Sequence, residues 1–466
     1  MDRTDTLPLA PNSAAARDVA FCVHPYTNLK KHEETGPLVI TRGEGVRVYD
    51  ETGKAYIEGL AGLWCTALGF AEERLVEAAA RAMRRLPFYH GFGGKASPPT
   101  IDLAERLIGL APVPMSKVFF ANSGSEANDT AIKLIWYYNN AIGRPEKKKI
   151  ISRIKAYHGV TIASASLTGL PANHAAFDLP LDLIKHADCP HHYRFANSGE
   201  SEEDFAIRLA ESLDALIVAE GPETVAAFFA EPVMGAGGVI VPTATYFDKI
   251  QPVLKRHDVL LVADEVICGF GRTGNLWGSD TYALKPDMLT TAKALSSGYL
   301  PISALMISEP IWRAMVEQSD RVGMFGHGFT YSGHPVPAAV ALETLDIYAE
   351  RDIVGHVRAV SLALQDGLRR FADHPLVGEV RGIGLVAGVE IVADKATKAP
   401  FDAKMGVAAR VAKQAERNGL ITRALGDTLA FSPPLVITEG EIGEMLDCFG
   451  RALDETLAWL EQEGQT

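Results

Sequence analysis

Hydrophobic and polar residues alternate in blocks along most of the chain. From about residue 70 to 300, short apolar runs bounded by glycine, proline and polar residues alternate with longer stretches of helical periodicity. Short apolar runs of this kind predict buried strands, and their alternation with helices is typical of βαβ units. We therefore expect an α/β fold with a mostly parallel sheet in this part of the chain.

The two ends of the chain carry a different pattern. Residues 1–20 predict a loose arm, and residues 45–58 predict a hairpin with a glycine-containing turn. Beyond about residue 335, two long helical stretches flank strand-like segments near 382–392 and 428–431, which indicates a smaller α+β domain joined by the hairpin. The predicted division is an N-terminal arm and hairpin that is part of the small domain (1–60), a large domain (61–334) and a C-terminal small domain (335–466).

A carboxylate and an amine stand at the ends of two predicted strands. Asp264 ends the apolar run that begins at residue 259, and Lys293 follows the run 286–292. Ligands of open α/β sheets bind at the edge formed by the carboxyl ends of the strands, so both side chains are expected there. Enzymes that use pyridoxal phosphate (PLP) need this pair: the lysine forms a Schiff base, and the aspartate partners the pyridinium nitrogen. The pair alone leaves an ordinary ion pair open as the alternative.

A third predicted strand, residues 117–121, leads into a small polar turn and a helix start. Ser123, Gly124 and Ser125 at this turn can form an anion nest, in which backbone N–H groups and hydroxyls converge on a phosphate. The alternative is a simple helix cap, because Ser123 and Glu126 have the spacing of a capping box.

Two further predicted strands end in residues that suit a cofactor. Tyr157 follows the run 150–156, and it can stack on a planar ring or belong to the core. Glu231 follows the run 226–230, where a carboxylate is unusual unless it is paired or functional. Together the five strand ends supply a phosphate nest, a ring face, two carboxylates and an amine, and this combination favours a PLP site.

Composition limits the classes of function. The chain has 466 residues, a net charge of -13, 47% hydrophobic and 22% charged residues, which is typical of a soluble protein and argues against nucleic-acid binding. The five cysteines are scattered and lack CxxC spacing, as expected for reduced thiols in the cytoplasm. The first residues do not resemble a signal peptide, and no run of 18 apolar residues predicts a membrane span.

Two further patterns resemble a dinucleotide-binding motif and a metal site, but neither predicts one. Residues 269–274 match GxGxxG, but the following residues 275–278 do not predict a helix start, so dinucleotide binding is not expected. His191 and His192 near Cys189 can bind a metal, but their spacing suits no standard site. We expect this segment to be a solvated loop, and we expect no metal site in the chain.

These residues resemble the signature of class III (ω-) aminotransferases, which have PLP fold type I. The resemblance runs from about residue 25 to 455, and the nearest branch is the amine:pyruvate, β-alanine:pyruvate and putrescine:pyruvate group. The segments that carry it are ANSGSEAN (121–128), YHG (157–159), EP (231–232), GAGGV (235–239), LVADEV (261–266), GFGRTG (269–274), PD to AK (286–293) and GFTYSGHP (328–335), with AGLWC (61–65) and TRALGD (422–427) for the branch.

The resemblance implies a role for each matching residue. Lys293 is expected to bind PLP covalently, and Asp264 to pair with the ring nitrogen. The other expected cofactor contacts are Tyr157 and Val266 on the ring faces, Ser123, Gly124 and Ser125 at the phosphate, His158 and Glu231 nearby, and Thr330 from the neighbouring subunit. The expected substrate contacts are Trp64, Phe92, Tyr157 and Ala236, with Arg423 on the acceptor carboxylate.

The implied activity is ping-pong transfer of an amino group from a primary amine or ω-amino acid to a keto acid, pyruvate being expected, in a homodimer or dimer of dimers. A PLP-dependent aminomutase or decarboxylase on the same fold is the alternative enzyme, and a non-catalytic PLP-binding regulator is the alternative outside enzymes. Relatives often have paired aromatics where this chain has Phe92 followed by Gly93. Gly93 therefore predicts either a roomier pocket or only a turn.

Overall fold

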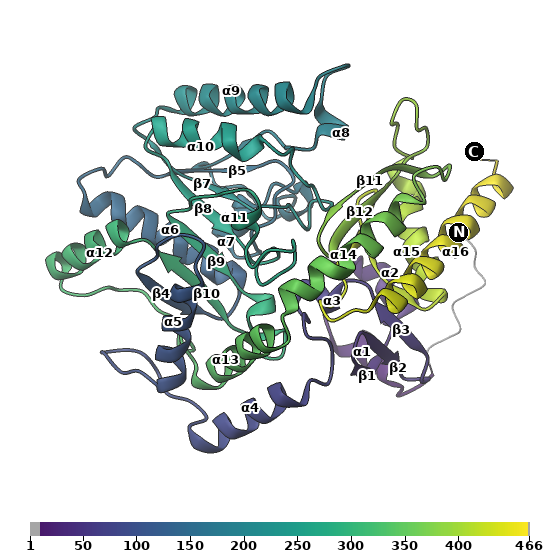
Figure 1. Cartoon of the computed structure of the whole chain (residues 1–466), viewed down its shortest axis with the longest axis horizontal. Coiled ribbons are helices and arrows are strands. Elements are labelled where there is room, and N and C mark those ends of the chain that lie inside the picture. The colour runs from purple at the N-terminus through teal and green to yellow at the C-terminus, as the bar shows by residue number, and fades with distance from the viewer. Residues whose placement is uncertain (1–9, 465–466) are drawn as a thin grey trace.

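The computed structural model describes residues 10–464, which form a large sheet-and-helix body beside a smaller one (Figure 1). The large body contains a seven-stranded sheet in the order β4-β10-β9-β8-β7-β5-β6. Strand β10 runs antiparallel to β4 and β9, and every other pairing in this sheet is parallel. The strands are β4 (Lys117–Ala121), β5 (Lys149–Arg153), β6 (Ile184–Ala187), β7 (Val225–Ala230), β8 (Leu260–Asp264), β9 (Met288–Thr291) and β10 (Ser303–Ile307).

Helices cover both faces of this sheet (Figure 1), and its central strands β7 and β8 are almost entirely apolar, as expected for parallel strands buried on two sides. On one face, α6 (Gly124–Ala141) and α12 (Glu309–Val322) pack in one apolar cluster with the strands. On the other face, α9 (Glu202–Glu220) and α10 (Tyr246–Arg256) form a second cluster. The remaining helices of the large body are α4 (Glu73–Arg85), α5 (Pro98–Leu110), α7 (Ile162–Leu167), η1 (Pro171–Asn173), α8 (His192–Phe195), α11 (Gly278–Thr281), η2 (Lys293–Ser296) and α13 (Pro335–Glu350).

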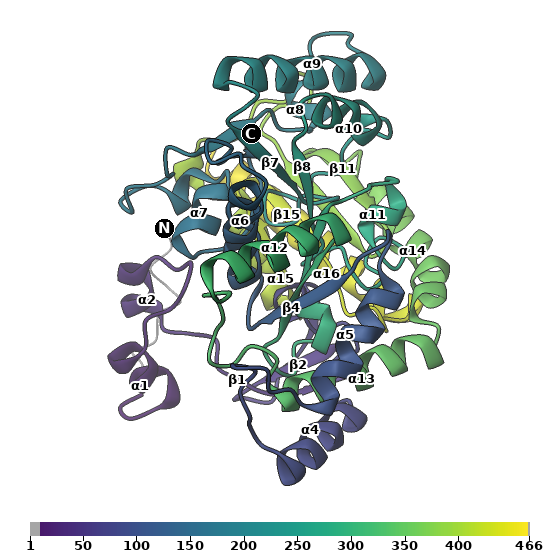
Figure 2. The same ribbon diagram turned by 90° about the vertical axis from the view of Figure 1, so that its left-hand side faces the viewer.

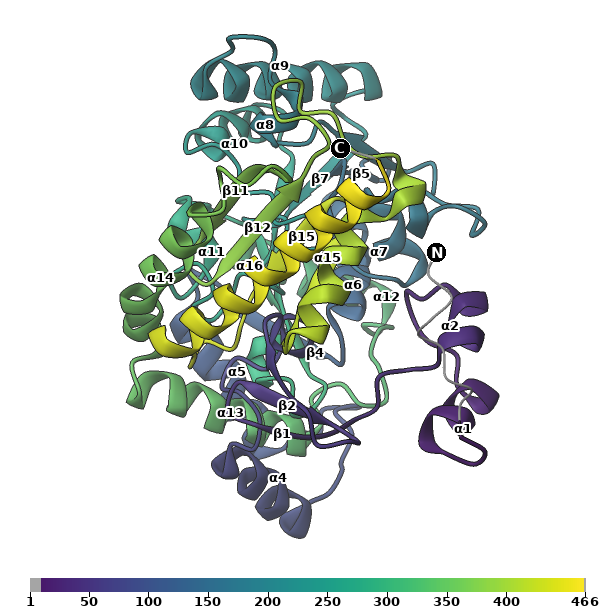
Figure 3. The same cartoon turned by 90° about the vertical axis from the view of Figure 1, so that its right-hand side faces the viewer.

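The smaller body joins both ends of the chain, as the hairpin pattern predicted. Strand β3 (Ala55–Glu58) pairs with β2 (Arg47–Asp50) in the expected hairpin and lies parallel to β13 (Leu420–Ile421). Helix α16 (Glu439–Gln462) lies beside α15 (Val407–Arg417) across this body (Figure 3). Its other elements are β1 (Ile40–Glu44), α3 (Ala61–Trp64), α14 (Ile353–Arg369), η3 (Ala403–Met405), and the sheet of β11 (Val377–Ile383), β12 (Val386–Ile391), β15 (Thr428–Phe431) and β14 (Arg423–Leu425).

One predicted strand is in fact two. The segment 382–392 contains the end of β11, a tight turn and all of β12, and the two strands pair antiparallel. The turn passes so close to the large body that a Cβ at Gly384 would lie 2.4 Å from the carbonyl oxygen of Arg272. Only glycine, which also tolerates the positive φ of 57° found there, fits this approach. The domain boundaries at 60/61 and 334/335 stay predictions.

The prediction of a loose arm over residues 1–20 is wrong for its second half. Residues 1–9 lie outside the described part, but α1 (Ala14–Phe21) is a helix whose first turn is capped by the Ser13 hydroxyl, which accepts from the N–H of Ala16 at 3.1 Å. A second helix, α2 (Leu29–Thr35), follows. The two helices stand at one edge of the molecule, away from the main sheets (Figure 2).

The prediction of a solvated loop at His191 is also wrong. His191 is buried, and its Nε2 lies 2.8 Å from Oε2 of Glu379 on β11. Arg381 donates to Glu379 and Glu390 and also, through Nε, to the carbonyl of Val239 in the large body. The histidine therefore belongs to a buried ionic network that joins the two bodies, which a reading of local spacing does not detect.

The GxGxxG segment joins the bodies as well. Arg272 within it is buried and donates through Nη1 to the carbonyls of Leu385 and Pro433. Contrary to the prediction, a one-turn helix, α11, does begin at Gly278, because the Glu265 carboxylate accepts the N–H groups of Gly278 and Ser279. None of the helices within residues 10–464 is long and apolar enough to cross a membrane.

Candidate active site

A cavity of about 360 Å³ opens at the carboxyl ends of the central strands. Because β9, β8, β7 and β5 are neighbours in the sheet, residues that follow them in sequence meet there. All of the predicted strand-end residues line this cavity. They are Ser123, Gly124, Ser125, Tyr157, His158, Glu231, Asp264, Val266 and Lys293.

The buried carboxylate of Asp264 is fixed by bonds from three directions. Its Oδ2 lies 2.8 Å from Nδ1 of His158 and accepts from Nδ2 of Asn128 at 2.8 Å. Its Oδ1 accepts from the N–H of Val266 at 3.1 Å. A carboxylate that is 3% exposed needs such hydrogen-bond partners, and they hold it in one orientation at the cavity wall.

Asn128 connects helix α6, which begins at the predicted phosphate nest, to the carboxylate of Asp264. It lies on α6 and is 1% exposed, and its Nδ2 donates both to Asp264 and to the backbone carbonyl of His158, the latter at 2.7 Å. The sequence analysis did not predict Asn128 as a site residue. A signal was present: a buried asparagine inside a helix has low helix propensity and needs a partner.

The carboxylate of Glu231 holds backbone segments of the site in place through both of its oxygens. Its Oε1 accepts the N–H of Tyr157 at 3.0 Å, and its Oε2 accepts the N–H of Gly235 at 3.0 Å. Burial raises the pKa of this carboxyl. The side chain therefore positions the backbone of Tyr157 and of the 235–239 loop, which contains the half-buried Ala236.

The polar turn after β4 caps helix α6 and also has the form of the predicted anion nest. The Ser123 hydroxyl accepts from the N–H of Glu126, but the Glu126 carboxylate accepts from the N–H of Asn122, so the capping box is only half formed. The α6 N-terminus opens into the cavity at Gly124 and Ser125. A Cβ at Gly124 would lie 3.1 Å from the side chain of Val266, so glycine leaves room where backbone N–H groups face an anion.

Lys293 lies where β9 turns into η2, with a positive φ of 46°. Left-handed backbone at a non-glycine residue is uncommon and concentrates at functional sites. Cys65 shares the cavity wall with Lys293. Burial raises the pKa of the Cys65 thiol, while the charge of Lys293 acts in the opposite direction.

Among the predicted substrate residues, Tyr157 lines the cavity. A second tyrosine, Tyr26, which the sequence did not predict, interacts with it. Burial raises the pKa of Tyr157, and Tyr26 and Arg423 also act on it. The guanidinium of Arg423 lies 5.6 Å from the ring of Tyr26, which comes from the turn between α1 and α2. Periodicity gave no sign of Tyr26, because the contact spans almost the whole chain. Trp64 is buried in an apolar cluster with Ile267, a residue of the cavity wall.

Phe92 and Thr330 do not reach the Lys293 cavity of their own chain. Both are exposed, and Phe92 instead lines a separate cavity with Gly328 and Phe119. Gly93 next to it has a positive φ of 63°, which favours the interpretation that this glycine shapes a turn.

Comparison with known proteins decides the family. The family model for class III aminotransferases matches residues 29–453. This chain belongs to the class III aminotransferases. The expected fold, PLP fold type I, is thereby confirmed, and the cofactor of this aminotransferase is PLP.

Individual relatives agree with this assignment. The chain is 53% identical over 439 residues to gamma aminobutyrate transaminase 1, mitochondrial, of Solanum lycopersicum, covering 94% of this chain and 85% of that protein. It matches the ω-transaminase of Pseudomonas jessenii in complex with PMP with a TM-score of 0.95 and 56% identity over 96% of this chain and 99% of that one. A solved transaminase with L-Ala matches with a TM-score of 0.90 and 58% identity over 91% and 100% of the two chains.

The cavity fits PLP. It presents an amine at Lys293, a fixed carboxylate at Asp264 and a helix N-terminus at Gly124, which suit the aldehyde, the pyridine nitrogen and the phosphate of the cofactor. Tyr157 and Val266 supply apolar surface in the same cavity. These side chains are therefore the ones that would hold the cofactor.

We expect Asn128→Ala to slow amino transfer about 10- to 100-fold, because a hydrogen bond to a charged group contributes about 1.5–3 kcal/mol. Asn139→Ala is the matched control: Asn139 is equally buried on α6 but donates to the carbonyl of Ile135. Single-turnover kinetics and the absorbance of the bound cofactor check the effect. If both variants change rate and spectrum equally, Asn128 has no special role at Asp264.

Proposed function

We propose that this aminotransferase transfers the amino group of a primary amine or ω-amino acid, with γ-aminobutyrate as the first candidate, to pyruvate by a ping-pong mechanism. The observation that carries the proposal is the guanidinium of Arg423, which lies over the ring of Tyr26 and whose charge acts on Tyr157, a residue that lines the cavity with Lys293 and Asp264. The names of the relatives support the donor and the product, since one is a gamma aminobutyrate transaminase and another was solved with L-Ala. Alanine is what pyruvate becomes when it accepts an amino group.

Each residue has a defined task in this reaction. Bound PLP supplies an electron sink for the bond that breaks at the amine-bearing carbon. Lys293 would hold the cofactor, and its amine is the group that would move a proton at the amine-bearing carbon of the substrate. Asp264, kept in place by His158 and Asn128, holds a positive charge at the ring nitrogen.

Arg423 explains how one pocket accepts two kinds of substrate. A planar guanidinium binds a carboxylate through two parallel hydrogen bonds, so it suits both the carboxylate of pyruvate and the distal carboxylate of an ω-amino acid. Arg423 is half-buried, and its guanidinium makes a cation–π contact with the exposed ring of Tyr26. An uncharged amine would be accepted with Arg423 turned aside.

We expect a panel of amines with pyruvate to give alanine, with γ-aminobutyrate, β-alanine, putrescine and a simple primary amine all tested as donors. Alanine formation and donor consumption should be equal in amount, because each amino group passes through the cofactor once. Donor turnover that proceeds without any keto acid would indicate an aminomutase or a decarboxylase instead. No turnover with any donor would support a non-catalytic PLP-binding protein.

Arg423→Ala should raise the KM for pyruvate far more than the KM for an uncharged aldehyde acceptor, by about 10- to 100-fold for the loss of a charge-assisted pair. Arg423→Lys is the matched control, since it keeps the charge but loses the planar fork and should lie between wild type and alanine. Equal effects on both acceptors would show that Arg423 only supports the fold.

We further propose that the enzyme is a homodimer in which Phe92 and Thr330 complete the site of the partner subunit. Both residues are exposed and lie outside the Lys293 cavity of their own chain. The segments that carry them come together although they are distant in sequence: a Cβ at Gly328, two residues before Thr330, would lie 3.4 Å from the ring of Phe92. A shared surface of aromatic residues, with Phe88 at 5.4 Å from Tyr331, supports an interface.

Mixed dimers test this arrangement. Lys293→Ala should be inactive alone, and Thr330→Arg should be weakened because it loses a phosphate contact and blocks the neighbouring site. When the two variants are refolded or co-expressed together, about a quarter of wild-type activity should return, since half of the dimers are mixed and each has one intact site. Mixing that restores nothing, or a stable active monomer in light scattering, would contradict the shared site.

We also propose that the enzyme acts in the cytoplasm. The five cysteines are all free thiols in the described residues, as a reducing compartment requires. Cell fractionation with an antibody against the native chain tests this proposal, and recovery in an organelle fraction would refute it.

A further inference from the structure

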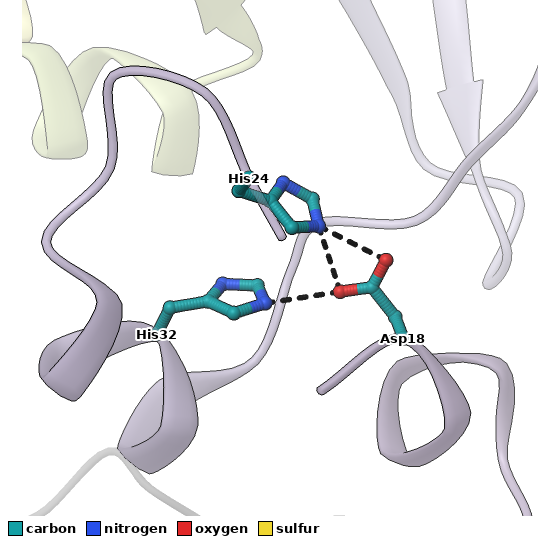
Figure 4. Close-up of side chains that lie close together, drawn as sticks. All are labelled: Asp18, His24 and His32. Atoms are coloured by element: carbon teal, nitrogen blue, oxygen red, sulfur yellow. Dashed lines mark hydrogen bonds and ion pairs between the residues drawn. The ribbon is translucent and has the colours of Figure 1, made fainter. Parts of the chain in front are cut away.

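Three side chains that can bind a metal converge at the N-terminal edge, far from the PLP cavity residues in sequence (Figure 4). Asp18 lies on α1, His32 on α2 and His24 on the turn between them. Oδ2 of Asp18 lies 2.8 Å from Nε2 of His24 and 3.0 Å from Nε2 of His32. Both imidazoles therefore present the same ring nitrogen to one carboxylate oxygen.

We propose that Asp18, His24 and His32 form a binding site for a divalent cation, Zn²⁺ foremost, with water as the fourth ligand. Two imidazole nitrogens and one carboxylate oxygen are a ligand set that zinc accepts in open tetrahedral sites. Bonds of about 2.0–2.1 Å in a tetrahedron separate the ligand atoms by about 3.3 Å, so each imidazole nitrogen needs to move away from the Asp18 oxygen by only a few tenths of an ångström. The sequence spacing did not predict this site.

The charges around the cluster suit a cation. Within residues 10–464, the ion pairs of Asp18 are those to the two histidines. The His24 side chain is 33% exposed, which leaves an approach for the cation and its water.

A second group with metal-binding side chains does not have this property. His191, Glu379 and Glu390 also lie close together. Arg381 donates to both of these carboxylates, and Arg194 donates to Glu390, so arginine charges already occupy the position of a cation. In the N-terminal cluster, by contrast, the side-chain partners that the described residues supply to the Asp18 carboxylate are the two histidines, which can themselves become ligands.

A metal at this position would brace the turn that carries Tyr26. That turn lies between the two histidine ligands, and the Tyr26 hydroxyl accepts from Nδ2 of Asn173 at 2.6 Å while its ring lies beside Arg423. Fixing α1 to α2 would therefore fix one wall of the substrate side. This consequence rests on the proposed function, whereas the binding of the metal does not.

Calorimetric titration of untagged, PLP-loaded, metal-depleted enzyme with zinc chloride tests the site directly. One Zn²⁺ per chain is expected, with a Kd in the micromolar range or lower. Titration with Co²⁺ should produce the visible absorption of a tetrahedral N/O site. The absence of a one-per-chain site would overturn the proposal, whatever the transaminase activity of the sample.

Variants identify the ligands. Asp18→Asn and His32→Gln keep similar shapes, and each should weaken Zn²⁺ binding more than about 100-fold, because loss of a ligand costs more than loss of a residue that supports one. Cys22→Ser is the matched control, since Cys22 is an exposed thiol two residues before His24. Unchanged binding in Asp18→Asn and His32→Gln, or loss of binding in Cys22→Ser, would overturn the assignment of the ligands.

Limited proteolysis provides a structural readout. Lys30 and Lys31 are exposed on α2, between the two histidine ligands. Zn²⁺ should slow tryptic cleavage there several-fold in the wild type but not in His32→Gln, while cleavage at the exposed Lys398 should be unchanged in both. Equal cleavage of α2 with and without Zn²⁺ would show that the metal does not join the two helices.

Discussion

The active site depends on one buried carboxylate. Taking Asp264 out of water is costly unless its charge is met by hydrogen bonds, and the fold meets it with His158 and Asn128. These partners come from the loop after β5 and from α6, so satisfying one charge fixes three separate segments relative to each other. The same bonds place the phosphate-facing end of α6 at a set distance from the carboxylate. The cavity wall is therefore rigid before any substrate enters.

Much of this arrangement is readable from the sequence, for a physical reason. Parallel strands buried on both faces appear in the sequence as short apolar runs, and their carboxyl ends lie at one edge of the sheet. Residues that follow these strands, such as Asp264, Glu231 and Lys293, therefore lie together at that edge. What a strand-end residue does there is less predictable. Glu231 lies in the cavity wall as expected for a strand-end residue, and its carboxylate also bonds to the backbone of Tyr157 and Gly235, which the pattern did not predict. The pattern along the chain predicts where a strand-end residue lies. It does not predict which groups that residue bonds to, because those groups come from loops whose course the pattern does not determine.

The arm that contains α1 was expected to be loose, but a capping serine and the bonds of Asp18 to His24 and His32, all within the arm, stabilise it. The other errors come from contacts between distant segments. His191 was expected in a solvated loop because its spacing suits no standard metal site, but it is buried by a strand almost 190 residues later. Tyr26 and Asn128 were missed for the same reason: one is brought to Arg423 by the arm, and the other meets a strand that follows it by more than 130 residues.

The buried wall of the site around Asp264 and the exposed residues at its rim differ in how well they tolerate substitution. The residues that hold Asp264 are buried and mutually bonded, so most changes there leave a polar group without a partner. Tyr26, Phe92 and Thr330 are exposed and come from the arm and from loops, where substitutions cost little stability. A protein of this fold can therefore keep its cofactor chemistry while the shape of its substrate side changes. This separation explains why the cofactor follows from a few strand ends, whereas the preferred amine depends on residues at the edge of the molecule.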